Sequence, residues 1–194
     1  MHINKEEDAS YMKIQKIPNW LTTLRIALIP LLVLVFQVQP VFYKEISTLI
    51  FFIAAVTDFF DGYIARKYDV VSQFGKFFDP VADKLLVTIS FILLAVAYQN
   101  IWITLSALII ISREILMSSF REWIANSKLK SNVSVSLVGK WKTTFQMLAI
   151  GGLFWAANSV MLVVTYLCLF SATILTLYSL YLYFKEFGHT ISDF

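Results

Sequence analysis

The sequence has little charge, one cysteine and two histidines. Only 15% of its 194 residues are charged, whereas 58% are hydrophobic, and this balance is typical of membrane proteins. Its single cysteine, Cys168, excludes an internal disulfide, and we expect it to be a small buried side chain. Nothing in the charge pattern resembles a nucleic-acid-binding protein. The sequence therefore predicts a membrane protein with no nucleic-acid partner.

Segments outside the apolar runs are short. The first ten residues are polar and mixed in charge, so we expect no cleavable signal peptide and expect the membrane segments to direct insertion. No internal repeat or low-complexity linker divides the chain. We therefore predict one membrane domain at 18–185, between an N-terminal cytoplasmic segment at 1–17 and a cytoplasmic tail at 186–194.

Long apolar runs predict the fold class, an all-α integral membrane protein. About 20 apolar residues in a helix cross a hydrocarbon core of ~30 Å. Six such runs predict six transmembrane helices, at 20–37, 46–65, 80–98, 101–120, 143–157 and 160–184. Ahead of them, YMKIQKIP at 11–18 alternates apolar and basic residues, which indicates a short amphipathic helix lying in the membrane interface.

Lysine and arginine gather in the loops on one side of this topology. The loops on the opposite side hold only Lys44. Because basic loops stay in the cytoplasm, both termini are predicted to be cytoplasmic.

Four aspartates lie close together at the ends of two predicted spans: Asp58, Asp61, Asp79 and Asp83. An acidic side chain at the centre of a span costs roughly 2.5 to 3.5 kcal/mol, so four together indicate a cation site or a proton pathway. Spacings of three and four residues put each pair on one helix face. If the polar stretch between the pairs turns the chain, the two faces meet. We favour a divalent metal over a polar network that only fixes helix packing.

The residue types around the aspartates specify the metal and its substrate. Carboxylate oxygens prefer Mg²⁺ or Mn²⁺, and no histidine or cysteine lies nearby to favour zinc. Such a site suits a diphosphate, because the metal neutralises charge on the leaving phosphate. The small residues Gly62 and Ala65 leave room for a large group, and Arg66 offers a fork for a phosphate. A carboxylate at the rim is a candidate general base.

Residues 58–83, DFFDGYIARKYDVVSQFGKFFDPVAD, match the pattern DxxDGxxARx8GxxxDxxxD at every fixed position. The chain thereby resembles the CDP-alcohol phosphatidyltransferases. The resemblance implies a six-helix homodimer that transfers a phosphatidyl group from a CDP-linked lipid to an alcohol and releases CMP. It also implies that all four aspartates bind metal, and that Asp83 is the general base.

The resemblance further implies contacts with the CDP-linked lipid. Gly62, Arg66 and Ser72 match positions that contact the CDP moiety, and Ala65 and Gly75 permit its close approach. Ser72 is alternatively an ordinary turn residue. Two more residues, Asn19 and Thr22, resemble positions near the nucleotide, although both also suit the polar start of a helix.

Three stretches outside the motif indicate the acceptor: IPNWLTTLRIALIP, ISREILMSSFREW and SVSLVGKWKTTFQM. They resemble bacterial members of the family that use CDP-diacylglycerol and sn-glycerol 3-phosphate. The resemblance implies a multi-pass protein of the bacterial inner membrane, and the distribution of basic residues predicts that the aspartates face the cytoplasm.

An acceptor phosphate requires cationic partners. The candidates are Arg113, Arg121, Lys140 and Lys142, all within or beside the fourth and fifth spans. Structural pairing of Arg113, for example with Glu114, is the alternative for that residue, and snorkelling to headgroups is the alternative for Lys142. For Arg25, one turn inside the first span, we expect snorkelling or pairing with an internal acid.

Two other functions stay open. One is a transferase of the same family with a different acceptor alcohol. The other is an ion-coupled transporter, which predicts acids near the bilayer midplane and broken helices in paired halves. No such repeat is visible in the sequence.

Overall fold

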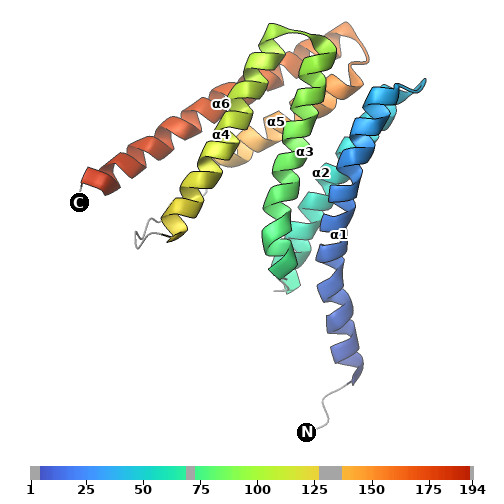
Figure 1. Cartoon of the computed structure of the whole chain (residues 1–194), viewed down its shortest axis with the longest axis vertical. Coiled ribbons are helices and arrows are strands. Elements are labelled where there is room, and N and C mark those ends of the chain that lie inside the picture. Colours follow the sequence, from blue (N-terminus) through green and yellow to red (C-terminus); the bar gives the residue numbers. More distant parts are fainter. Residues whose placement is uncertain (1–4, 69–72, 127–136, 193–194) are drawn as a thin grey trace. The chain divides into compact units, whose positions relative to one another are not determined.

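A computed structural model of the chain describes residues 5–68, 73–126 and 137–192, with side chains at 20–58, 60, 75, 77–124 and 139–185. The regular structure within these ranges is entirely α-helical, as predicted (Figure 1). The helices are α1 (Lys5–Val38), α2 (Tyr43–Tyr68), α3 (Gln73–Tyr98), α4 (Ile101–Asn126), α5 (Leu137–Trp155) and α6 (Ser159–Ser192).

Four of these helices contain segments long and apolar enough to cross a membrane. The segments are Trp20–Val38 in α1, Phe77–Tyr98 in α3, Ile101–Ile124 in α4 and Ser159–Lys185 in α6. Large apolar side chains point outward along the helices, among them Phe52, Leu167 and Ile174. Exposed apolar surface of this extent suits a hydrocarbon surrounding rather than water. The all-α membrane fold is confirmed at this level.

The N-terminal helix is longer than the sequence predicts. α1 runs without interruption from Lys5 to Val38, so the segment at 11–18 is its first part and not a separate short helix. A proline removes one backbone hydrogen bond and need not end a long helix. Pro18 and Pro30 accordingly lie inside α1, and Pro80 lies inside α3.

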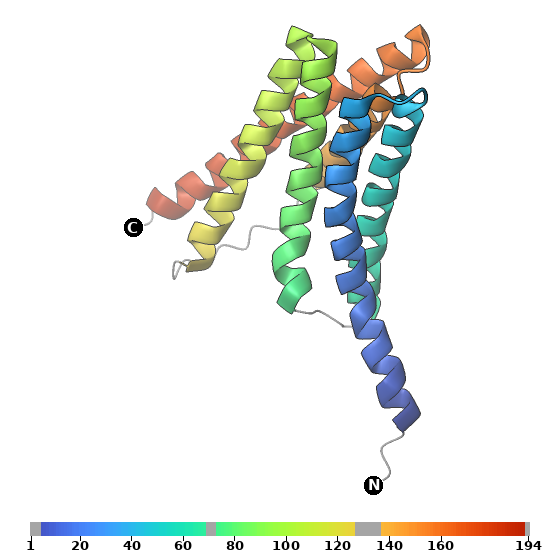
Figure 2. The same cartoon turned by 45° about the vertical axis from the view of Figure 1, so that its right-hand side comes forward.

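Tight turns join α1 to α2, α3 to α4 and α5 to α6 (Figure 2). Each helix that enters a turn is followed by a residue with positive φ: Gln39 at 49°, Gln99 at 45° and Ala156 at 40°. Their amide nitrogens donate to carbonyl oxygens four residues back, at 3.1, 3.1 and 2.8 Å. A single left-handed residue ends a helix in this way, and short connections make consecutive helices antiparallel.

The chain divides into an N-terminal unit, Met1–Ile89, and a C-terminal unit, Ser90–Phe194. In the N-terminal unit, α1 packs on α2 through buried side chains such as Leu32 and Ala54. In the C-terminal unit, α6 packs on both α4 and α5. A Cβ added at Gly152 of α5 would lie 3.2 Å from Cβ of Thr165 in α6, so glycine allows this close helix contact.

Candidate active site

Two aspartates of the motif converge on one arginine in the N-terminal unit. Arg25 of α1 places Nη1 2.7 Å from Oδ1 of Asp83 in α3 and 3.1 Å from Oδ1 of Asp58 in α2. Both carboxylates therefore lie within 3.1 Å of the same cationic nitrogen. Three helices contribute to this cluster, which we call the Arg25 cluster.

A second contact ties α1 to the aspartates of α3. The hydroxyl of Thr22 donates a hydrogen bond to Oδ1 of Asp79. Thr22 and Arg25 are three residues apart on α1, and Asp79 and Asp83 are four apart on α3, so each pair lies on one helix face. One face of α1 therefore holds both aspartates of α3.

The accessibility of the cluster differs between its anions and its cation. The side chains of Asp58 and Asp83 are each 42% exposed, whereas the side chain of Arg25 is 0% exposed. A buried guanidinium cannot reach headgroups, so of the two expectations for Arg25, snorkelling is wrong and pairing with internal acids is confirmed. The carboxylates are open to an incoming ligand, and their counter-ion is not.

Sequence reasoning set the two aspartate pairs against each other and did not include α1 in the cluster. The available signal was Arg25 itself, because a lone arginine inside an apolar run needs an acidic partner. Thr22 lies one turn before it on the same face, and with Arg25 it could have identified α1 as the third helix.

The residues present fit a hard divalent cation in their chemistry. The donors are carboxylate oxygens, which Mg²⁺ and Mn²⁺ prefer, and two of them already converge on a positive charge. Among the described side chains, no group of three or more acidic, histidine or cysteine residues has the arrangement of a metal site. Asp61 lies outside those side chains, so the complete set of four aspartates is not tested there.

Most of the predicted nucleotide contacts lie where side chains are not described. Asp61, Gly62, Ala65 and Arg66 belong to α2, which continues to Tyr68, and Asn19 belongs to α1, whereas Ser72 falls outside the described backbone. Gly75 is buried near the start of α3. Their roles stay predictions.

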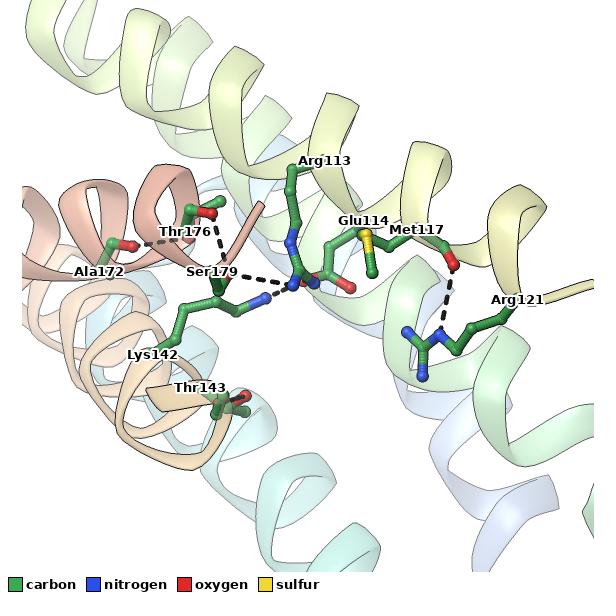
Figure 3. A network of polar contacts seen from close by, with 10 residues as sticks. Arg113, Glu114, Met117, Arg121, Lys142, Thr143, Ala172, Thr176 and Ser179 are labelled. Carbon is green, nitrogen blue, oxygen red and sulfur yellow. Dashed lines mark hydrogen bonds and ion pairs between the residues drawn. The ribbon is translucent and has the colours of Figure 1, made fainter. Parts of the chain in front are cut away.

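A second polar network lies in the C-terminal unit (Figure 3). Lys142 of α5 donates to Oε1 of Glu114 in α4, and Nη1 of Arg113 lies 3.6 Å from the same oxygen. Nη2 of Arg113 also donates to Oγ of Ser179 in α6 at 3.0 Å. We call Arg113, Glu114, Lys142 and Ser179 the Glu114 network. Glu114 joins α4 to α5 through Lys142, and Arg113 joins α4 to α6 through Ser179.

The cations of this network are largely buried. Exposed fractions of the side chains are 12% for Arg113, 6% for Lys142 and 20% for Glu114. Buried polar atoms without a hydrogen-bond partner in the described part of the chain include two at this place: Nε of Arg113, and Oε1 of Gln146 one turn after Lys142. Buried polar atoms normally have partners, so the network retains capacity for a polar ligand.

The other two predicted acceptor contacts differ from this pair. Arg121 and Lys140 are exposed, and Nε of Arg121 donates to the carbonyl oxygen of Met117 on its own helix at 3.3 Å. Ser179 was missed, because the sequence indicates no chemistry for the last apolar helix and a serine there carries no charge to mark it.

The chain matches known proteins over most of its length. Residues 15–181 match the family model described as CDP-alcohol phosphatidyltransferase. A relative from Haemophilus influenzae is 47% identical over 177 residues, which are 91% of this chain and 96% of the relative. Relatives from Yersinia enterocolitica and Pectobacterium atrosepticum are 44% and 42% identical, over 86% and 91% of this chain and 92% and 97% of their own lengths. All three are named CDP-diacylglycerol--glycerol-3-phosphate 3-phosphatidyltransferase.

Proposed function

Because the chain belongs to the CDP-alcohol phosphatidyltransferase family, we propose that it transfers the phosphatidyl group from CDP-diacylglycerol to sn-glycerol 3-phosphate. The products are phosphatidylglycerophosphate and CMP. The shared name of relatives that cover nearly the whole chain supports this choice of acceptor. The structural observation that carries the proposal is the convergence of Asp58 and Asp83 from two helices on one cationic position.

The four aspartates Asp58, Asp61, Asp79 and Asp83 hold Mg²⁺ or Mn²⁺ in this proposal. A metal held by these aspartates would neutralise negative charge on the diphosphate of the lipid nucleotide. Asp58 and Asp83 support this role, because both are accessible and both present oxygen to a cation. Asp79 is held in place by Thr22 of α1.

Residues close to the aspartates bind the CDP moiety of the lipid. By family resemblance they are Gly62, Arg66 and Ser72, with Asn19 and Thr22 near the nucleotide, and with Ala65 and Gly75 as the small residues that permit close approach. The hydrogen bond from Thr22 to Asp79 supports the placement of Thr22 next to the motif.

Asp83 accepts the proton of the acceptor alcohol. Its accessible carboxylate takes the proton as the hydroxyl oxygen attacks the phosphorus that bears the diacylglycerol. A new phosphorus–oxygen bond forms to the acceptor, the bond from that phosphorus to the CMP oxygen breaks, and CMP leaves with the electron pair. The aspartate returns its proton to solvent or to the leaving phosphate.

The Glu114 network binds the phosphate of the acceptor. Arg113 and Lys142 supply buried positive charge, and the buried atoms without partners beside them support a polar ligand at this place. Glu114 pairs with both cations, so an entering phosphate must compete with it or displace it. Arg121 and Lys140 are exposed, and their contribution is to attract the dianion from solution.

The membrane arrangement completes the proposal. By family resemblance the chain crosses the membrane six times: the four apolar segments are spans, and α2 and α5 are the other two. By the same resemblance it functions as a homodimer among membrane lipids. Both termini and the aspartates face the cytoplasm of a bacterial inner membrane. The tight turns from α1 to α2, from α3 to α4 and from α5 to α6 contain no lysine or arginine, and only Lys44 lies just after one of them; this lack of basic residues on that side supports the orientation.

An acceptor panel tests the reaction. Purified protein in detergent receives CDP-diacylglycerol, Mg²⁺ or Mn²⁺, and one alcohol at a time: sn-glycerol 3-phosphate, serine, inositol phosphate or phosphatidylglycerol. We expect CMP release with sn-glycerol 3-phosphate to exceed release with the other acceptors by roughly a hundredfold, which corresponds to about 2.7 kcal/mol. Preference for another alcohol would identify a different transferase of the family, and absence of CMP release with every alcohol would favour the transporter alternative.

A further inference from the structure

The most deeply buried charge in the described part of the N-terminal unit belongs to neither pair of aspartates in the motif. The side chain of Arg25 is fully buried, and it contacts one carboxylate from α2 and one from α3. Burying a charge in a low-dielectric interior is expensive unless it is paired, so this arginine must be compensated by the two aspartates.

Arg25 in turn compensates the negative charges of the two aspartates. Asp58 and Asp83 are two like charges that meet at one nitrogen, and without a cation between them they would repel each other. Both contacts use Oδ1, and a carboxylate has a second oxygen that can accept another cation. Arg25 can therefore hold the pair together through one oxygen of each aspartate.

We propose that Arg25 is the positioning residue of the aspartate site, because its guanidinium fixes Asp58 and Asp83 in one place and sets their distance for a divalent cation. The inference rests on the proposed metal role of these aspartates. Arg25 acts through them and needs no contact with the substrate. Residues that orient metal ligands change metal affinity by roughly 10- to 100-fold when they are replaced.

Binding of Mn²⁺ tests the positioning role without catalysis. The full chain in detergent is titrated with Mn²⁺, and free Mn²⁺ is measured by electron paramagnetic resonance. We expect Arg25→Gln to weaken Mn²⁺ binding roughly tenfold or more. Because Asp58 and Asp83 both contact the single nitrogen Nη1, Arg25→Lys, which keeps one charged nitrogen on a shorter side chain, should stay within about threefold of the unaltered protein. Leu32→Ala, at another fully buried position of α1, is the matched control for lost packing.

A second measurement covers the case in which Arg25→Gln does not fold. Removal of the arginine leaves two aspartates uncompensated, so the double variant Arg25→Gln with Asp58→Asn should fold better than Arg25→Gln alone. The readout is the midpoint of thermal unfolding in chelator. A double variant that is less stable by the sum of the two single changes would overturn the pairing, because independent sites add.

The outcomes separate this inference from the proposed function. If the unaltered protein binds no Mn²⁺, the metal site itself is overturned, and the positioning role with it. If the protein binds Mn²⁺ and Arg25→Gln binds it equally well or more tightly, only the positioning role is overturned, because Arg25 would then merely compete with the metal or fill space.

Discussion

The two polar clusters of this chain are opposite in charge and similar in design. In the N-terminal unit, one buried arginine pairs with two aspartates, and in the C-terminal unit one glutamate pairs with an arginine and a lysine. Each cluster involves three helices: Arg25 of α1 contacts α2 and α3 directly, whereas Glu114 links α4 to α5 and its partner Arg113 reaches α6. Because the surroundings are apolar, the central residue of each cluster, Arg25 or Glu114, permits two like charges to lie together.

The clusters differ in which charges are accessible. In the Arg25 cluster the paired anions are 42% exposed around a fully buried cation, whereas in the Glu114 network the paired cations are 6% and 12% exposed around a glutamate that is 20% exposed. The first cluster can accept a cation without losing its central residue. The second can accept an anion only when Glu114 yields. In the roles proposed for the two clusters, metal binding would need less rearrangement than acceptor binding.

The largest expected effect tests the accessible carboxylates. Asp83→Asn should fold and insert but lose roughly 10²- to 10⁴-fold in kcat, because an amide cannot accept the proton. CMP release at saturating substrates measures the loss. The matched control is Glu45→Gln, an exposed acid-to-amide change in the first turn of α2. Near-normal turnover by Asp83→Asn would refute the general-base role.

The next prediction compares the loss of stability when Glu114 is replaced with the loss when Lys142, one of its two partners, is replaced. Glu114→Gln leaves two buried cations without their carboxylate and should destabilise the protein by roughly 3 kcal/mol, the lower end for a broken buried pair. Lys142→Met should cost about 1 kcal/mol or less, because Glu114 keeps Arg113. Thermal unfolding in detergent compares the variants. Equal losses would contradict the shared-carboxylate arrangement.

A smaller effect tests whether the Glu114 network binds the acceptor and not the CDP-linked lipid. Arg113→Ala should raise the apparent KM for sn-glycerol 3-phosphate about tenfold, equivalent to about 1.4 kcal/mol, and should change the KM for CDP-diacylglycerol much less. Initial rates with each substrate varied in turn give both constants. Equal increases for the two substrates would remove the acceptor role of Arg113.

The smallest effects belong to the exposed basic residues. Arg121→Ala and Lys140→Ala should each raise the KM for sn-glycerol 3-phosphate by about two- to threefold. The increase should vanish at high salt, because exposed charges are screened. The assay is repeated at low and high ionic strength. A tenfold effect that persists in salt would place these residues in direct contact with the phosphate.

Local patterns explain why much of the fold could be predicted. Apolar runs of membrane-crossing length predict helices that the structure contains, and the spacing of Asp79 and Asp83 correctly indicates a shared helix face. The prediction of a separate short helix at 11–18 is wrong, because the alternation of apolar and basic residues before Pro18 belongs to the first part of α1. Pro18 and Pro30 both lie inside α1, so a proline in the sequence does not by itself mark a helix boundary.

Contacts between distant residues explain what the sequence could not predict. Arg25 is 33 or more positions away from either aspartate that it contacts, and Ser179 is 66 positions away from Arg113. Periodicity assigns a residue to a face of its own helix, but it does not identify the helix that packs on that face. The one usable signal was a charged residue inside an apolar run. It indicated that Arg25 has an acidic partner, but not which residue that partner is.

Metal dependence of the transfer reaction tests the central claim most directly. The protein is freed of divalent cations with a strong chelator, and CMP formation from CDP-diacylglycerol and sn-glycerol 3-phosphate is followed before and after Mg²⁺ or Mn²⁺ is restored. We predict that activity falls to background and returns with the cation, and that Asp58→Asn responds only at much higher concentrations. Unchanged turnover in the chelator would contradict the account.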